Sequence, residues 1–193
     1  MKRMTNVALA GFAAVAIAAS LGGMSPTFAQ MKEKTVTVGG APMYPSKNIV
    51  QNAVNSKDHT TLVAAVKAAG LVPTLESPGP FTVFAPTNAA FAKLPAGTVD
   101  TLLKPENKAQ LTKILTCHVV AANAMSSAIK KMISDDKGMH PVKTVGGCTF
   151  TAKMRGDKIV LVDGKGNEAA VTIANVRQSN GVIHVIDTVL LPG

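Results

Sequence analysis

The chain has 193 residues, of which 47% are hydrophobic, 16% are charged and 4% are aromatic, a composition that excludes disordered, collagen-like and disulfide-rich miniprotein classes. The length predicts one globular domain. The formal net charge of +9 favours an acidic partner, but the lysines are scattered and the one Tyr and six Phe offer few platforms for stacking bases, so we expect no nucleic acid partner.

The first 29 residues have the pattern of a secretory signal. Lys2 and Arg3 precede an apolar stretch over residues 7–21, and a Gly and Pro break follows it. This stretch of about fifteen residues is shorter than the roughly 20 that a membrane-spanning helix needs. We therefore predict a signal peptide over residues 1–29 and a mature protein that is secreted, to the periplasm or outside the cell, with no stable membrane insertion. The alternative is an uncleaved anchor. The predicted signal peptide contains two basic residues and no acidic residue, so the mature chain has a formal net charge of +7.

The mature chain is predicted to begin with an N-terminal arm over residues 30–45, which Gly and Pro punctuate. The domain is expected to follow over residues 46–193. Ser46 can cap a first short helix, and Asp58 can cap a second helix that Gly70 ends.

Alternating apolar and polar residues from Phe81 to Phe84 predict a half-buried strand. Three short helices are expected after it, beginning near Thr87 or Asn88, at Thr98 and at Pro105. A helical stretch is expected over residues 123–132, and β-type runs over residues 148–153, 158–162, 169–173, 182–186 and 188–191. Early helices and late antiparallel strands predict an α+β domain rather than a doubly wound sheet.

Three segments carry a family resemblance. They are Phe81–Phe91, Leu115–Val120 and Asn180–Asp187, the last followed by Val189–Pro192. In content and order they resemble the first long motif, the short central Tyr-His segment and the second long motif of the fasciclin domain. The resemblance extends over residues 48–192, nearly the whole mature chain.

The resemblance implies a wedge-shaped β-sandwich with several short helices packed on one side, as used in secreted and surface proteins for adhesion. Two positions differ from the family pattern. Cys117 stands where the central Tyr is usual, and Asn175-Val176 replaces the usual Asp-Ile pair ahead of the second motif. Because the resemblance ties both positions to integrin contact in animal relatives, it implies a different partner for this chain.

The leading hypothesis is therefore a secreted, non-enzymatic module for cell adhesion or matrix contact. Its expected partner is a cell-surface or matrix protein or polysaccharide of acidic character. The alternative is a carrier of an apolar small molecule, such as a carotenoid or lipid, held between the two long motifs as in some fasciclin-domain proteins. We expect no cofactor. The candidate binding residues are Pro86, Thr87, Asn88, His118, Val182, Ile183 and His184.

Several of these residues also have a structural interpretation. Thr87 and Asn88 can accept hydrogen bonds from the start of a helix. His118, expected on a strand, and His184 lie among apolar neighbours, where a neutral imidazole needs hydrogen-bond partners. His184 and Asp187 would point to opposite faces of a strand, so no acid–base dyad is expected. The sequence has no nucleophile elbow, phosphate loop or zinc-hydrolase helix, and we predict no enzyme activity.

The chain has two cysteines, Cys117 and Cys148. In an exported protein such a pair favours a disulfide, here closing a loop of about 30 residues, and two separate buried thiols are the alternative. Neither these residues nor His118 and His140 show the close ligand spacing of zinc sites, so we expect no metal site.

Arg155-Gly156-Asp157 lies between two of the predicted β runs, which places it at a hairpin tip. One interpretation is that the tripeptide is displayed to an integrin. The other is that Gly and Asp only meet the backbone requirements of a tight turn.

Overall fold

The computed structural model describes residues 34–193. The predicted signal peptide, residues 1–29, lies outside this part of the chain. Regular structure begins inside the predicted arm, before Ser46, with an antiparallel hairpin of β1 (Val36–Val38) and β2 (Ala41–Met43). Val38 and Met43 are buried in a core that the hairpin shares with the helices after it.

Four helical segments follow the hairpin. Asn48, rather than Ser46, caps the first of them, because its side chain accepts from the backbone N–H of Gln51. Gly70 ends the third in a left-handed conformation, as predicted, with φ at 73°. The bounds are α1 (Ile49–Ala53), the 3-10 helix η1 (Lys57–His59), α2 (Thr60–Ala69) and α3 (Val72–Glu76).

The middle of the chain is mostly helical, with one strand on either side of four consecutive helical segments. The predicted helices after the first motif are present, but His118 lies at the C-terminal cap of a helix and not on a strand, which corrects that expectation. The elements are β3 (Phe81–Pro86), α4 (Asn88–Ala92), α5 (Thr98–Leu102), η2 (Pro105–Asn107), α6 (Lys108–Cys117), β4 (Val119–Val120) and α7 (Ser126–Asp135).

The last third of the chain is mostly strand. The elements are β5 (Met139–Lys143), β6 (Thr149–Arg155), β7 (Lys158–Val162), β8 (Glu168–Gln178) and β9 (Gly181–Ile186). The strand predicted over residues 188–191 is wrong. In that segment the N–H of Leu190 donates to His118 and the N–H of Leu191 donates to Asp163, so these groups are used by side chains instead of a strand ladder.

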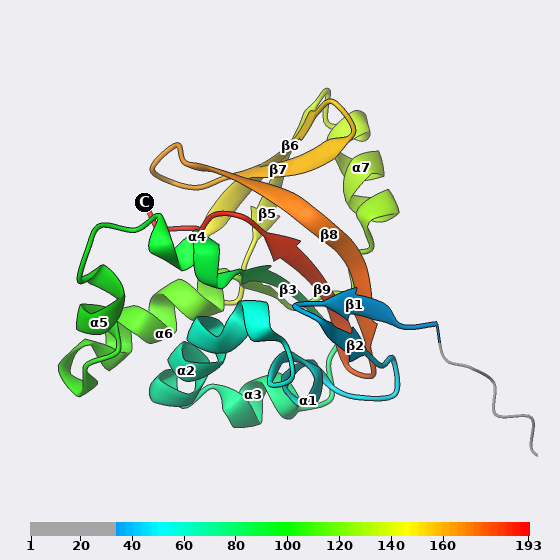
Figure 1. Ribbon diagram of the computed structural model, residues 1–193. Coiled ribbons are helices and arrows are strands. Elements are labelled where there is room, and N and C mark those ends of the chain that lie inside the picture. Colours follow the sequence, from blue (N-terminus) through cyan, green and yellow to red (C-terminus); the bar gives the residue numbers. More distant parts are fainter. Residues whose placement is uncertain (1–33) are drawn as a thin grey trace, which may run out of the picture. The chain divides into compact units, whose positions relative to one another are not determined.

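Seven strands form one sheet in the order β4-β3-β9-β8-β7-β6-β5. The pair β3 and β9 is parallel, and the other neighbours are antiparallel. The long strand β8 joins the two halves of the sheet, and two register shifts interrupt its pairing with β9 between Val171 and Val176. Such bulges bend a strand. Figure 1 shows the half that contains β5, β6 and β7 turned away from β3 and β9.

The sheet has a hydrophobic core on each face. Helices α1 to α6 and the N-terminal hairpin pack on one face of β3 and β9, where they bury Val83 and Ile183. Phe84 points the other way, into a second core between the two sheet halves that α7 closes with Ile129 and Ile133. The predicted α+β class is confirmed, as is the β-sandwich with short helices.

None of the helices within residues 34–193 is long and apolar enough to cross a membrane.

Candidate functional site

The two long motifs lie side by side along the parallel strands β3 and β9. Val182 is paired with Thr82 and His184 with Phe84, whereas Pro86 is paired with Ile186 at the far end (Figure 1). Strands rise about 3.3 Å per residue, so Pro86 lies roughly 13 Å along the strand from the level of Val182. The candidate residues of the two motifs therefore extend along the strand pair and do not gather in one place.

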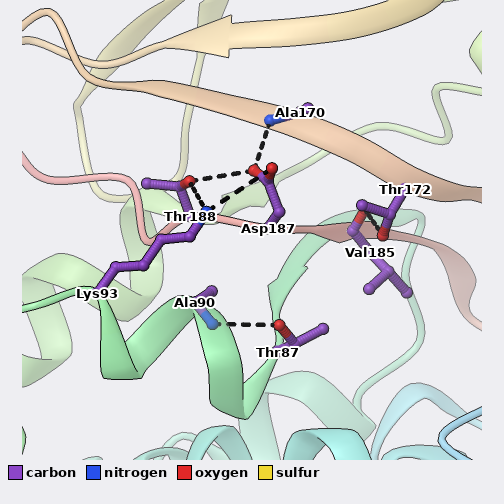
Figure 2. Close-up of polar contacts among 8 residues, drawn as sticks. All are labelled: Thr87, Ala90, Lys93, Ala170, Thr172, Val185, Asp187 and Thr188. Atoms are coloured by element: carbon purple, nitrogen blue, oxygen red, sulfur yellow. Dashed lines mark hydrogen bonds and ion pairs between the residues drawn. The ribbon is translucent and has the colours of Figure 1, made fainter.

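Thr87 and Asn88 fasten the helix that follows β3. The Thr87 hydroxyl accepts from the N–H of Ala90 at 3.2 Å and so caps α4 (Figure 2). The Asn88 amide reaches the start of α2, where it accepts from the N–H of Thr61 at 3.0 Å and donates to the carbonyl of Lys57 at 2.8 Å. Both side chains already have partners inside the fold.

A group of polar residues lies where β9 ends, beside α4 and β8. The Asp187 carboxylate accepts from the N–H of Ala170 at 2.8 Å and from the hydroxyl of Thr188 at 3.1 Å. Lys93, at the end of α4, extends toward the same carboxylate at 3.8 Å and donates to Thr188 at 3.1 Å (Figure 2). Asp187 thus ties the end of β9 and α4 to β8 at Ala170, a role that the sequence alone did not indicate.

His118 is 2% exposed, and both of its ring nitrogens are used. Nε2 accepts from the N–H of Leu190 at 3.0 Å, so Nδ1 carries the proton and donates to the carbonyl of Ile114 at 2.8 Å. Burial lowers the pKa of His118 to about 4, although the Ile114 carbonyl and Asp163 oppose the shift. The ring is therefore neutral at physiological pH and links the end of α6 to the C-terminal segment.

His184 has the opposite arrangement of donor and acceptor. Nδ1 accepts from the N–H of Asn175 at 3.3 Å, and Nε2 donates to the carbonyl of Ala124 at 2.8 Å. Its ring stacks on Phe84 with centroids 5.7 Å apart, and burial lowers its pKa. The neighbouring Val182 is fully buried, so this stretch of the second motif presents no free polar group to a ligand.

Asn175 occupies one of the two positions where the sequence differs from the family pattern. Its backbone is left-handed, with φ at 61°, a conformation that Asn tolerates better than most residues. Its side chain accepts from the N–H of Ser126 at 2.8 Å and donates to the Ser126 hydroxyl at 2.7 Å, so it holds the first turn of α7.

The other differing position, Cys117, forms a disulfide with Cys148, and their Cα atoms are 5.4 Å apart. The bridge connects the end of α6 to the start of β6. Gly146 lies against it: a Cβ there would come within 2.7 Å of the Cys117 nitrogen and 2.9 Å of its sulfur. The absence of a side chain at this position lets the loop before β6 pass close to α6.

Arg155-Gly156-Asp157 forms the turn between β6 and β7. Gly156 has φ at 58°, which fits the first central position of a type II′ hairpin turn. The Arg155 guanidinium is ion-paired with Glu168, which also accepts from Lys153 at 2.7 Å. Lys153 and Arg155 together lower the pKa of Glu168. The Arg side chain is thus engaged on the surface of its own sheet.

An apolar cavity of about 60 Å³ lies between the first three helices and the pair β3 and β9. Two of the seven candidate residues, His118 and Ile183, line it. His59 and Ser56, which the sequence interpretation missed, also line it. The spacing of His59 to Val63 and Val66 is the helical repeat of an apolar face, and this signal could have placed His59 in the interior.

His59 is the unusual group of this cavity. It is 3% exposed, and its Nδ1 lies 2.9 Å from the Ser56 hydroxyl. Its Nε2 is buried with no hydrogen-bond partner within residues 34–193. Burial lowers the pKa of His59, and the Ala85 carbonyl and Asp58 only partly offset this. The imidazole therefore stays neutral and keeps one ring nitrogen unsatisfied.

Across the described residues, no three His, Cys, Asp or Glu side chains are grouped so that they could hold a metal ion. His184 and Asp187 have separate partners, Ala124 and Ala170 respectively. The polar side chains of this region mainly form hydrogen bonds to the domain's own backbone.

Comparison with known proteins gives the family. The model of the Fasciclin domain matches residues 57–192. The chain is 45% identical to protein sll1483 of Synechocystis, over 96% of this chain and 93% of that protein. It is 38% identical to the cell surface glycolipoprotein MPB83 of Mycobacterium bovis, over 72% of this chain and 58% of that protein.

A solved structure shows the same fold. The FAS1 domain pair from the insect cell adhesion molecule fasciclin I matches with a TM-score of 0.52 and 23% identity. The match covers 67% of this chain and 43% of the insect chain. Together with the family model and the relatives, this shows that the chain belongs to the fasciclin domain family.

Proposed function

We propose that the protein is an exported, non-enzymatic fasciclin module that contacts an acidic macromolecule at the cell surface or in the extracellular matrix. The family membership carries this proposal, because fasciclin domains are generally adhesion-type modules and a relative over most of the domain is named a cell surface glycolipoprotein. The domain itself offers many cations on its surface for such contact.

The charge of the domain supports an acidic partner. The mature chain carries +7, and four of its basic side chains, Lys93, Lys131, Lys153 and Arg155, are ion-paired with carboxylates. These pairs leave a clear excess of positive charge on the domain. A net field of one sign steers oppositely charged partners and speeds their association.

Removal of the protein from its native cells tests the proposal. We expect the cells to lose adhesion to their substratum or to one another, and we expect purified mature protein added from outside to restore it. Heat-unfolded protein at the same concentration is the control for non-specific coating by a basic chain. Unchanged adhesion in cells that lack the protein would contradict the proposal.

A second candidate function is carriage of an apolar small molecule, and the apolar cavity favours it. The cavity lies between the helices and the strand pair, and not between the two motifs. An apolar cavity of 150 Å³ is large enough for benzene, so this smaller one would hold only one end of a lipid or carotenoid. The rest of such a molecule would extend through the helical side.

Purification from native cells tests this candidate. A carrier would release a pigment or lipid into organic solvent in a fixed ratio to protein, detectable by absorbance and mass spectrometry. Protein that is colourless, yields no apolar extract and binds no apolar probe would rule out carriage.

A further inference from the structure

The cavity follows one face of α2. Its lining includes His59, Val63 and Lys67, which recur every four residues along the helix. At about 1.5 Å per residue the cavity lining extends roughly 12 Å from His59 to Lys67. The two ends differ in exposure, since His59 is buried and Lys67 is exposed. Val50 and Ala53 of α1 also line the cavity and are partly exposed, so with Lys67 they form its rim toward solvent. The cavity therefore has a closed end at His59 and an open side between α1 and α2.

The closed end is held rigidly around His59. The hairpin turn at Gly39 accepts the N–H of Lys57 at 3.2 Å, and a Cβ on Gly39 would come within 2.3 Å of the Ser56 hydroxyl oxygen. This contact fixes Ser56 at Nδ1 of His59. The ring is thereby oriented from one side, while Nε2 on the other side has no partner.

An unsatisfied buried nitrogen costs free energy that a partner could recover. The Ala85 backbone lies near enough to the ring to raise its pKa in part, but the contact does not have the distance and angle of a hydrogen bond to Nε2. The cavity lining is otherwise almost wholly apolar, apart from Ser56, His118 and Lys67. Both nitrogens of His118 are already bonded, and the Ser56 hydroxyl is bonded to His59. His59 is thus the group at the closed end that is left to recognise a ligand.

We propose that this cavity binds a small apolar molecule with one hydroxyl group, and that the hydroxyl bonds to Nε2 of His59 while the apolar part lies along α2. A hydroxyl both donates and accepts, so it can satisfy Nε2 in either tautomer of the ring. The proposal rests on the second proposed function, carriage of an apolar molecule, and names the class of ligand and the residue that selects it.

The test compares two probes of the same length, hexan-1-ol and n-heptane, in which a methyl group replaces the hydroxyl. Each is titrated into the full ¹⁵N-labelled chain, and dissociation constants are obtained from amide shifts. In the wild type we expect both probes to bind and hexan-1-ol to show nuclear Overhauser contacts to the methyl groups of Val63 and Val66. His59→Phe should weaken hexan-1-ol about tenfold and leave heptane nearly unchanged, because only the alcohol loses a partner.

Three further variants keep the result interpretable. His59→Gln retains a side-chain amide and should preserve most of the hexan-1-ol affinity, which also controls for any general effect of replacing His59. Ala53→Phe fills the rim and should abolish binding of both probes. The matched change Val54→Phe, at a residue that is 49% exposed and outside the lining, should affect neither.

Two results would overturn the proposal in different ways. Equal weakening of both probes by His59→Phe would show that the hydroxyl is not recognised, while carriage of apolar molecules would stand. No binding of either probe to the wild type would remove both this proposal and the carrier function.

Discussion

At the scale of single residues, most polar side chains of the fasciclin motifs form hydrogen bonds that join the helices and strands of the fold. Asn180 shows this most clearly. Its amide accepts from the N–H of Ile49 at 3.1 Å and donates to the carbonyls of Leu75 and Ser77, so one residue of the second motif joins α1, the end of α3 and β9. Thr87, Asn88 and Asp187 have comparable roles at the other end of the strand pair.

Asp187 gives a direct test of this role. Asp187→Ala should lower the free energy of unfolding by about 1–3 kcal/mol, because the Ala170 N–H loses its acceptor. Urea unfolding followed by circular dichroism measures the change. Lys93→Met is the matched control: it removes the exposed ion pair with Asp187 and the exposed hydrogen bond to Thr188, and it should cost less than about 1 kcal/mol. Equal losses in the two variants would contradict the assignment.

His118 predicts how stability depends on pH. Its pKa is about 4 in the folded chain, against about 6.5 when unfolded. Between pH 4 and pH 6.5 the unfolded state binds more protons than the folded state. The contribution of His118 to folding stability is therefore present above pH 6.5 and is lost as the pH falls toward 4. The loss amounts to about 3 kcal/mol.

Urea unfolding at a series of pH values, on the wild type and on His118→Gln, checks this. The variant will be less stable throughout, but its decline between pH 7 and pH 4 should be smaller by about the same 3 kcal/mol. Parallel profiles for the two proteins would show that His118 is not responsible.

The sequence allowed part of this detail to be predicted. The interpretation of His118 and His184 as buried residues followed from their apolar neighbours. Their hydrogen-bond partners, at Leu190 and Ala124, could not be predicted, because these contacts depend on how the chain folds back over long separations. His59 was missed for a different reason: the apolar face of the predicted helix begins at Leu62, and His59, one turn earlier, was not counted in it.

At the scale of elements, the disulfide fixes the end of α6 to the start of β6. It closes a loop that contains β4, α7 and β5. Reduction, or Cys117→Ser with Cys148→Ser, should lower the free energy of unfolding by about 3–4 kcal/mol. Thermal unfolding with and without a reductant measures this. Unchanged stability after reduction, verified by thiol titration, would show that the bridge does not stabilise the fold.

Gly146 tests the packing beside the same bridge. Gly146→Ala should destabilise the protein by about 1–3 kcal/mol, because the new methyl group would overlap with Cys117. Gly166→Ala is a useful comparison: nothing lies within 4 Å of a Cβ there, so only the cost of its positive φ remains. A cost at Gly146 no larger than that at Gly166 would contradict the close contact.

Strands with an uninterrupted β-type run were predicted well, and those with an interrupted pattern were not. The run over residues 158–162 matches β7, whereas β5 was missed because Pro141 interrupts its pattern. Pro is tolerated there because β5 lies at the edge of the sheet, where a backbone N–H is not required on the outer side. The apolar run over residues 188–191 resembled a strand but is anchored by side chains instead.

At the scale of the whole domain, the strand pair β3 and β9 separates two cores. Phe84, expected in the core from its motif, is 1% exposed and lies in the core that α7 closes. Phe84→Ala should cost about 3–5 kcal/mol, measured by urea unfolding. Val54→Ala, at the exposed C-terminal cap of α1, should change stability by less than about 0.5 kcal/mol. A cost below about 1 kcal/mol at Phe84 would contradict its place in the core.

The overall class was predictable because helices dominate early in the chain and strands late. The parallel pairing of β3 with β9 was not, since their partners are about a hundred residues apart and no local pattern encodes their register. The cavity could not be predicted either, because its walls come from the N-terminal hairpin, several helices and the strands β3, β4, β8 and β9 at once. These features depend on packing between distant parts of the chain, which the sequence patterns do not reveal.

We propose that this basic fasciclin domain binds an acidic macromolecule outside the cell. Capture of partners by the mature domain from the native envelope and medium, at low and at high salt, tests it most directly. We predict a protein or polysaccharide that is retained at low salt and released at high salt, because charges separated by more than ~8 Å are screened at physiological ionic strength. Capture of an apolar small molecule alone, or of a macromolecule that is retained equally at low and high salt, would contradict this proposal.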